Sequence, residues 1–271
     1  MLSIMNYAEK IENLTNEYNS FQFNENVIDY EKYKLYSIVT SSTQLEGSTL
    51  DEIDTQLLLD DGITAKGKPL EHHLMVKDNY NAIRFVLEQA DKKILLSPEF
   101  LQQCNGFNMA STGIIRNSAT GIVDGTKGEF RKTSAKSEAL GYYAEFSKIP
   151  ALVENFCTEV NKQIFKNASI MDHLKTSFDA HANLILIHPW MDGNKRTSRL
   201  IMNFIQRRAE LPLTKVHKED NREYLDTLKI AKDTGDLNPF RNFMCEQYMK
   251  TLNYEISDYR KENGRSFNFI F

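Results

Sequence analysis

The sequence predicts a mostly helical domain with one irregular, strand-containing excursion near its middle. Only six prolines and twelve glycines interrupt its 271 residues. Between these residues, long stretches repeat apolar side chains at helical spacing. Five of the glycines fall between positions 113 and 141 among serines and threonines, a composition typical of irregular backbone and of β-hairpins. We therefore expect an all-α fold that carries one small hairpin.

The apolar spacing and the signals at helix ends place the elements in chain order. A short helix should stop at Gly62, and Ser97 is expected to cap another helix whose first turn carries Glu99. The irregular segment covers residues 113–149. The remaining helices are expected over residues 7–19, 29–46, 71–91, 151–165, 169–187, 195–210, 220–233 and 238–253.

Composition and charge exclude several classes of protein. The net charge of −4 and the pI near 5.9 argue against nucleic-acid binding through bulk electrostatics. The three cysteines are scattered and show neither metal-ligand spacing nor a disulfide pattern. No run approaches the roughly 18 apolar residues of a membrane span, and the N-terminal residues lack the apolar segment of a signal peptide. We expect a cytoplasmic protein that binds neither nucleic acid nor membrane.

Residues 188–199, HPWMDGNKRTSR, interrupt an otherwise apolar helical sequence with a cluster of polar side chains. Pro189 disfavours helix at the preceding residue, so the helix before it should end at about His188. The DGN stretch at 192–194 is turn chemistry, and the next helix is expected to begin at or just after its asparagine. Amide groups in the first turn of a helix have no partner within the helix and attract anions, phosphate above all.

The side chains of this segment match what chemistry on a phosphate requires. Arg196 and Arg199 lie three positions apart on one helical face, where planar guanidinium groups can grip two successive phosphates. Asp192 lies in the loop before them, where a carboxylate can hold Mg²⁺ against phosphate oxygens. His188 is the side chain suited to act as a base near neutral pH. Together these groups predict a phosphoryl or nucleotidyl transferase, the alternative being a plain capped helix junction with solvated arginines.

This segment resembles the signature of the Fic family, H-x-F-x-D/E-G-N-G-R-x-x-R. Trp190 stands for the usual aromatic residue, and Lys195 replaces the second glycine, which is a departure from the pattern. Residues 128–132, GEFRK, resemble the segment that leads into the family's flap, a hairpin that docks target chains. Residues 220–243 resemble the last helices of its core, so the resemblance covers roughly residues 50–245.

The resemblance also implies a division of the chain. A Fic-type helical core is expected over residues 51–250, with a small β-hairpin flap. An N-terminal helical extension over residues 1–50 would carry an inhibitory helix, and residues 251–271 would form a C-terminal tail.

Enzymes of this family typically transfer AMP from ATP to a Ser, Thr or Tyr hydroxyl of a target protein and release pyrophosphate. By resemblance, His188 would deprotonate that hydroxyl, and Asp192 would hold Mg²⁺ between the α- and β-phosphates. Tyr224 lies where the family often contacts the nucleotide base, although a core role is equally expected for a tyrosine on a helix face. The residues assigned to ATP are Gly193, Asn194, Lys195, Arg196, Thr197, Ser198, Arg199 and Tyr224.

Recognition of the target protein is assigned to the flap by the same resemblance. Ala135, Lys136, Ser137 and Glu138 would pair with the target chain in the manner of an added strand and align its hydroxyl with the leaving group. The sequence does not identify the target protein. It also leaves the oligomeric state open, a homodimer being one expectation.

A second motif lies near the N-terminus. SSTQLEG at 41–47 fits the family's inhibitory pattern, S/T-x-x-x-E-G/N, through Ser42, Glu46 and Gly47. Glu46 would pair with Arg199 and occupy the guanidinium that should hold the γ-phosphate. The resemblance therefore predicts an autoinhibited protein adenylyltransferase, although a glycine after a helix is by itself only a common C-cap.

Three other functions remain open at this point. Lys195 occurs at the same position in a Doc-like protein phosphotransferase, which transfers the γ-phosphate, but Arg199 together with Asp192 favours AMP transfer. The reverse reaction, removal of AMP from a target, would make Glu46 a catalytic residue. A non-catalytic adaptor that keeps the nucleotide as a structural ligand is the third possibility.

Overall fold

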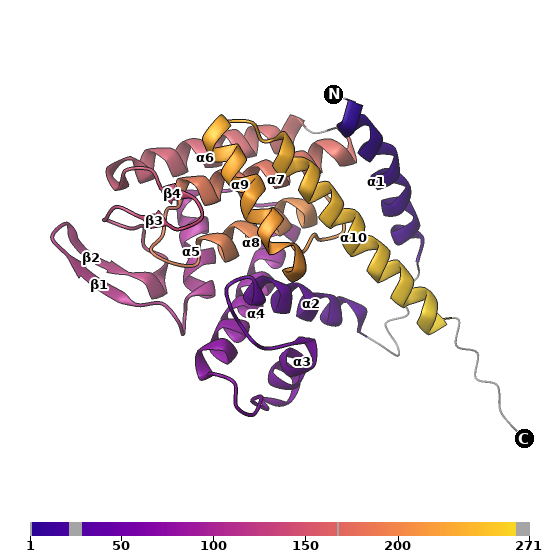
Figure 1. The fold of residues 1–271 in the computed structure, drawn as a ribbon, viewed down its shortest axis with the longest axis horizontal. Helices are drawn as coiled ribbons and strands as arrows, with labels where there is room; N and C mark the ends of the chain where they lie inside the picture. The colour runs from indigo at the N-terminus through magenta and orange to yellow at the C-terminus, as the bar shows by residue number, and fades with distance from the viewer. Residues whose placement is uncertain (1, 22–28, 167, 264–271) are drawn as a thin grey trace, which may run out of the picture.

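The protein is built from helices around one central helical pair, in a computed structural model that describes residues 2–21, 29–166 and 168–263. Figure 1 shows α7 and α8 inside the bundle, with α2 to α4 below them and α6 above. The α-helices are α1 (Leu2–Ser20), α2 (Tyr30–Gln44), α3 (Glu52–Asp61), α4 (Leu70–Asp91), α5 (Pro98–Asn108), α6 (Ile149–Lys166), α7 (Ile170–Ile187), α8 (Asn194–Arg208), α9 (Asn221–Thr234) and α10 (Asn238–Asn263).

The strands and short helical turns lie mainly between α5 and α6. They are β1 (Ile115–Ser118), β2 (Gly121–Asp124), η1 (Gly125–Lys127), β3 (Lys136–Ser137), β4 (Gly141–Tyr142), η2 (Phe146–Lys148) and, before α9, η3 (Lys218–Asp220). The predicted all-α class with minor β structure is confirmed.

The helix ends follow the capping signals in the sequence. The Ser97 side chain accepts a hydrogen bond from the backbone N–H of Phe100 at the start of α5, as expected. Gly62 ends α3 in the left-handed conformation with φ of 70°. The last helix is longer than expected, because α10 continues to Asn263, ten residues past the predicted end at 253. Charged and polar residues dominate that last stretch, which weakens the apolar pattern used to place its end.

The irregular segment holds two antiparallel hairpins where the sequence predicted one. β1 pairs with β2 so that Ser118 faces Gly121, and β3 pairs with β4 so that Ser137 faces Gly141. A glycine with positive φ begins the second strand of each hairpin. The glycines spread along this segment therefore mark two turns, and the second hairpin contains the residues expected to form the flap.

The core consists of two apolar clusters on either side of the α7–α8 pair. One cluster joins α4, α5 and α6 to the pair, and the other joins α1, α9 and α10 to it. Leu184 of α7 and Phe204 of α8 are fully buried in the middle. Because α7 and α8 are held from both sides, the loop between them is fixed by the whole core.

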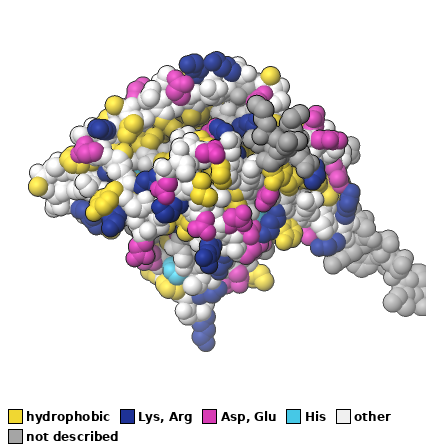
Figure 2. All heavy atoms as spheres, turned by 45° about the horizontal axis from the view of Figure 1, so that its top comes forward, with side chains coloured by type: hydrophobic (Ala, Val, Ile, Leu, Met, Phe, Trp, Pro, Cys, Tyr) yellow, Lys and Arg dark blue, Asp and Glu magenta, His cyan; other side chains and the backbone are white. Residues whose placement is uncertain are grey.

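The first two helices pack in different places. α1 runs along α10, whereas α2 lies against α4 and α8 (Figure 1). A division of the chain at residues 50 and 250 stays a prediction. Within the described part of the chain, no helix is both long and apolar enough to cross a membrane. On the face shown in Figure 2, basic and acidic side chains are interspersed, and neither sign forms a continuous surface.

Replacing Leu184 with alanine tests the central pair. Leu184 is fully buried, so truncation should lower the free energy of unfolding by about 2–5 kcal/mol, through lost apolar burial and the cavity left behind. Leu57→Ala is the matched control, because that leucine is 38% exposed. Chemical denaturation measures both variants. Equal losses in the two would contradict a core centred on α7 and α8.

Candidate active site

Hydrogen bonds within the loop between α7 and α8, and one from the loop to Gly128, hold its backbone in place. His188 ends α7 with φ of 53°, a left-handed conformation. Pro189 disfavours the helical conformation for the residue before it, so the helix does not continue. The Trp190 indole N–H donates to the carbonyl of Gly128 at 2.9 Å. The Asn194 side chain accepts from the Trp190 N–H at 3.0 Å and donates to the Trp190 carbonyl at 2.9 Å. Asn194 therefore closes the loop with its side chain and can offer an anion only its backbone.

Gly193 is required at the start of α8. It has φ of 77°, and a Cβ there would lie 2.6 Å from Asn105 Nδ2 and 2.8 Å from Met109 Sδ. Asn105 in turn donates to the Asp192 carbonyl at 3.2 Å. No side chain caps α8, so the amides of its first turn lack a partner within the helix and face the loop. This arrangement is suited to an anion.

His188 is enclosed by the second hairpin. Its imidazole stacks on the ring of Tyr143, with centroids 3.7 Å apart and planes 10° apart. Arg131 is buried and donates through Nε to the His188 carbonyl at 2.7 Å. Burial, and then the charge of Arg131, lower the pKa of His188 to about 3. The imidazole is therefore neutral at physiological pH and able to accept a proton.

The hairpin that carries Tyr143 is fastened to α9. The Tyr143 hydroxyl lies 2.9 Å from Ser137 Oγ. Lys232 of α9 donates to the carbonyls of Leu140, at 2.5 Å, and Tyr142, and its ammonium lies 4.8 Å from the centre of the Tyr143 ring. The predicted flap residues, Ala135 to Glu138, are thus in and beside β3, at the edge of the histidine site.

Both arginines of the motif are buried at the start of α8. Arg196 contacts the Asn108 carbonyl at 3.4 Å and Met109 Sδ at 3.1 Å. Five buried side-chain nitrogens or oxygens in the described residues have no hydrogen-bond partner, and three of them are His188 Nδ1, Arg196 Nε and Arg199 Nη1. Such groups are costly unless something binds them. Their convergence at one junction favours a site for a polar, anionic ligand.

Glu46 occupies this site from the other side. Its Oε1 lies 2.9 Å from Arg199 Nη2, and its Oε2 lies 2.9 Å from Lys195 Nζ. Arg199 also donates to the hydroxyl and the carbonyl of Ser42, at 2.9 and 2.8 Å. Burial would raise the pKa of Glu46, but the charges of Arg199 and Lys195 outweigh it and keep that pKa below its usual range. Glu46 is therefore ionised and held by two cations.

Gly47 follows in the same turn. It has φ of 96°, and its N–H donates to the Gln44 carbonyl at 3.0 Å. The glycine lets the chain leave α2 directly after Glu46. The part of Gly47 in an inhibitory motif stays a prediction.

Asp192 is the carboxylate available for a metal ion. Its side chain is 74% exposed, with Oδ1 accepting from the Gly193 N–H at 2.6 Å and Oδ2 lying 4.0 Å from Arg196 Nη2. No cluster of three acidic, histidine or cysteine ligands occurs among the described residues. A single accessible carboxylate fits Mg²⁺ that takes its other ligands from phosphates and water.

Three assignments made from the sequence look different in the structure. Thr197 and Ser198 are fully buried. Thr197 Oγ1 accepts a hydrogen bond from Asn105, and Ser198 Oγ donates one to the Asn194 carbonyl. Neither hydroxyl is therefore directed to a nucleotide. Their positions on α8 face the core, whereas Arg196 and Arg199 face the site. Tyr224 is also fully buried, with its hydroxyl 2.8 Å from His181 Nε2. It belongs to the core beneath the site.

Sequence reasoning missed three residues that shape the site. Arg131, Tyr143 and Lys232 position His188 and the flap, yet none lies in the motif. Arg131 was visible inside GEFRK, and an arginine beside a predicted hairpin was the only available signal. Tyr143 and Lys232 gave none, because their contacts join segments that are far apart in the sequence.

The chain is similar to known proteins over most of its length. Residues 111–206 match the Fic/DOC family model. The chain is 27% identical over 241 residues to "Protein adenylyltransferase fic-1" of Caenorhabditis briggsae, covering 88% of this chain and 44% of that protein. It is 26% identical over 225 residues to "Protein adenylyltransferase Fic" of Aedes aegypti, covering 82% of this chain and 42% of that protein. The chain thus spans less than half the length of these relatives.

Solved structures show the same fold. Fic-1 of C. elegans, residues 134–508, superposes with a TM-score of 0.78 at 22% identity, over 96% of this chain and 73% of that one. A Fic-domain protein of Bacteroides thetaiotaomicron gives 0.76 at 22% identity, over 98% of this chain and all of that one. Because these superpositions cover nearly all of the chain, the similarity in fold extends beyond residues 111–206.

Tyr143→Ala should raise the pKa of His188. Removing the stacked ring admits water to the imidazole, and less burial favours the charged form, so the pKa should move from about 3 toward its ordinary value by about one unit or more. An NMR titration of the His188 ring in the variant and in the wild type measures this change in pKa. Tyr142→Ala is the matched control, since that neighbouring ring is 71% exposed. An unchanged titration in Tyr143→Ala would contradict shielding by the stack.

Gly193→Ala should damage the loop more than backbone strain alone explains. Gly193 and Gly235 have similar φ values of 77° and 75°, but only at Gly193 would a Cβ meet other atoms within 4 Å. Gly235→Ala should cost about 1 kcal/mol of stability, and Gly193→Ala clearly more, because Asn105 and Met109 must move. Thermal unfolding of the two variants measures the difference. Equal costs would show that the close contact is unimportant.

Proposed function

We propose that this protein is an autoinhibited adenylyltransferase that transfers AMP from ATP to a hydroxyl side chain of a target protein. The observation that carries the proposal is the junction of α7 and α8. It combines a neutral histidine, three buried nitrogens without partners, and an ionised glutamate held where an anionic ligand fits. The names of the nematode and mosquito relatives, both protein adenylyltransferases, support the same activity.

ATP binding is assigned to the start of α8. The first-turn amides and Gly193 would hold phosphate oxygens, and Arg196 and Arg199 would take the β- and γ-phosphates through the guanidinium nitrogens that now lack partners. Asp192 would hold Mg²⁺, which supplies positive charge to the phosphates. Lys195, at the same end of the helix, adds a further cation beside the triphosphate.

His188 is proposed as the base. The target hydroxyl gives its proton to the imidazole while its oxygen bonds to the α-phosphorus. The bond from that phosphorus to the bridging oxygen of the β-phosphate breaks, and pyrophosphate leaves with the electron pair. The nearby cations that depress the pKa of His188 would be partly neutralised by the bound triphosphate, which raises the basicity of the imidazole when substrate is present.

The flap is proposed to dock the target. Ala135 to Glu138 lie in and beside β3, whose partner strand β4 leads directly into Tyr143 above the histidine. An extended target segment that pairs with this hairpin would be delivered next to the imidazole. Lys232 fastens the hairpin to α9 and keeps that approach constant.

Glu46 is proposed as the inhibitory residue. It binds Arg199 and Lys195 at once, so the γ-phosphate must displace a carboxylate from two cations to reach its position. Both charge-assisted contacts lie in a largely buried site, where they are stronger than on the surface. The free protein should therefore hold ATP weakly or in an unproductive pose.

Label transfer to protein tests the activity. With α-labelled ATP and Mg²⁺ in a cell lysate, Glu46→Gly should transfer label much faster than wild type, by about tenfold or more, since a charge-assisted contact is worth roughly 1.5–3 kcal/mol. Adding His188→Ala should abolish transfer. With γ-labelled ATP no label should appear.

Label from the γ-position would instead identify a phosphotransferase. Absence of transfer from both positions in Glu46→Gly would contradict the proposal. In that case, release of AMP from a modified protein by the wild type would be the reaction to measure.

Lys195 should contribute to inhibition separately from Arg199. Lys195→Gly restores the usual family residue and removes the contact to Glu46 Oε2, so basal AMP transfer should rise severalfold to about tenfold. Lys195→Arg, which keeps a cation opposite Glu46, should stay inhibited. In the Glu46→Gly background no carboxylate is left to release, so Lys195→Gly should instead lower transfer by removing a cation beside the triphosphate. A basal rate unchanged by Lys195→Gly would show that Arg199 alone holds Glu46.

A further inference from the structure

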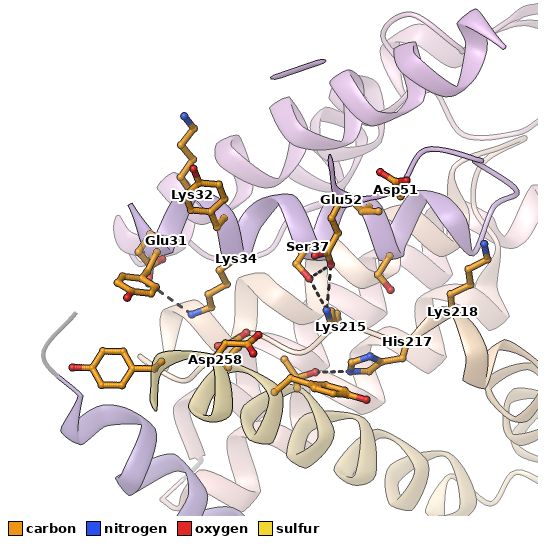
Figure 3. Close-up of a pocket in the computed structure, with 18 of the residues that line it drawn as sticks. Glu31, Lys32, Lys34, Ser37, Asp51, Glu52, Lys215, His217, Lys218 and Asp258 are labelled. Carbon is orange, nitrogen blue, oxygen red and sulfur yellow. Dashed lines mark hydrogen bonds and ion pairs between the residues drawn. The ribbon is translucent and has the colours of Figure 1, made fainter. Parts of the chain in front are cut away.

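A large cavity lies behind the inhibitory helix, on the side away from the proposed ATP site. It has a volume of about 900 Å³ and lies between α2, the segment around Lys215 to Glu219, and α10. Figure 3 shows Lys34 of α2 and Lys215 pointing into this space, with Asp258 of α10 on the opposite wall. Its size is within the range of small-molecule sites.

The cavity and the proposed ATP site share α2 as a wall. Ser42 of α2 binds Arg199, whereas the adjacent Ser41 lines the cavity and donates to the carbonyl of Val216 at 2.5 Å. Ser37, one turn earlier on the same side, accepts from Lys215 Nζ at 2.5 Å. A molecule in the cavity would therefore contact the helix whose end carries Glu46.

The walls of the cavity carry more negative than positive charge. Seven carboxylate and four lysine side chains line it, with five tyrosines among them. The histidine of the wall, His217, is neutral near pH 7, because burial and then Lys215 lower its pKa to about 4. The formal charge of the lining is therefore −3.

Three of the four lysines of the wall already have partners. Lys32 binds Asp60 at 2.6 Å, Lys34 donates to the Tyr18 hydroxyl at 2.8 Å, and Lys215 donates to Ser37. An anion would have to compete with these contacts and with the surplus carboxylates. The charge of the cavity thus disfavours an anionic ligand.

Glu255 shows the opposite situation. It lies on α10 in the cavity wall, and burial raises its pKa even though Lys34 opposes the shift. Lys34 and Lys215 offset this burial only in part, so a further cation beside the carboxylate would favour its ionised form. Tyrosine rings beside it supply faces that attract ammonium groups, as Lys34 over the Tyr18 ring at 5.1 Å already illustrates.

We propose that this cavity binds a small organic polyamine, with ammonium groups placed between the carboxylates of α2 and those of α10. Glu31 on one wall and Glu255 and Asp258 on the other lie in the lining and would be bridged by such a molecule. Its ammonium groups would compete with Lys34, 3.7 Å from Glu31, and with Lys261, 3.1 Å from Asp258. The hydrocarbon between the ammonium groups would lie along the tyrosine rings.

Bridging has a consequence for regulation that rests on the proposed function. A polyamine that joins α2 to α10 binds the state in which α2 is in place, and so stabilises that state. Glu46 would then be held more firmly on Arg199 and Lys195. The ligand is expected to deepen inhibition.

Binding is tested directly with spermidine and the full chain by isothermal titration calorimetry. Wild type should bind it with a saturable isotherm. Glu255→Gln/Asp258→Asn should bind about tenfold more weakly or worse, because two facing charges are removed. Asp258→Asn alone, at an exposed residue, should show part of the loss and guards against misfolding of the double variant.

The matched control removes the same charge elsewhere. Glu154→Gln/Glu159→Gln alters two exposed carboxylates of α6 and should bind spermidine like wild type. No saturable binding to wild type overturns the proposal. Equal weakening in the control and in Glu255→Gln/Asp258→Asn also overturns it, because it would mean attraction by net charge alone.

The regulatory consequence needs a second readout. Spermidine should lower AMP transfer by wild type and leave transfer by Glu46→Gly unchanged. An increase in AMP transfer by the wild type on adding spermidine would overturn the claim that the ligand deepens inhibition. If no variant transfers AMP, the proposed function fails, while the calorimetric result on the cavity stands by itself.

Discussion

The contact of Glu46 with Arg199 and Lys195 is the interaction on which the account of this protein depends. One carboxylate satisfies two cations at 2.9 Å each, and the three groups come from α2 and the first turns of α8. A carboxylate and a terminal phosphate both bind a guanidinium group through paired oxygens, so under the proposed function they would compete for Arg199. Lys195, which differs from the glycine of the Fic signature, would strengthen the hold on Glu46.

The packing around the site holds the residues that Glu46 contacts in place. α7 and α8 are buried on both sides, and the loop between them is closed by Asn194 and by the close approach of Asn105 to Gly193. The start of α8 is therefore held by several contacts at once. On the other side of the loop, Tyr143 and Arg131 keep His188 neutral and in place, as the proposed role of a base requires.

Much of this site could be predicted from the sequence, because its parts are close together in the chain. Pro189 ends one helix, Gly193 begins the next, and the two arginines share a face by helical periodicity alone. The same periodicity turns Thr197 and Ser198 toward the core, and their assignment to ATP overlooked it. The helical fold followed from apolar spacing for the same local reason.

The remaining features depend on contacts that no local pattern contains. The pairing of Lys195 with Glu46 joins segments separated by about half of the chain. The stack of Tyr143 on His188 and the clamp from Lys232 depend on how the second hairpin folds back on the bundle. The cavity behind α2 lies between α2 and α10, which pack mainly against different helices. Each follows from packing of the whole chain.

Nucleotide affinity tests the central competition most directly. Calorimetric titration of ATP and of AMP into wild type and Glu46→Gly separates the phosphates, because AMP carries no phosphate that would reach Arg199 in the proposed pose. Glu46→Gly should bind ATP about tenfold more tightly or better, while its affinity for AMP stays the same. An unchanged affinity for ATP, or an equal gain for AMP, would contradict competition between Glu46 and the γ-phosphate.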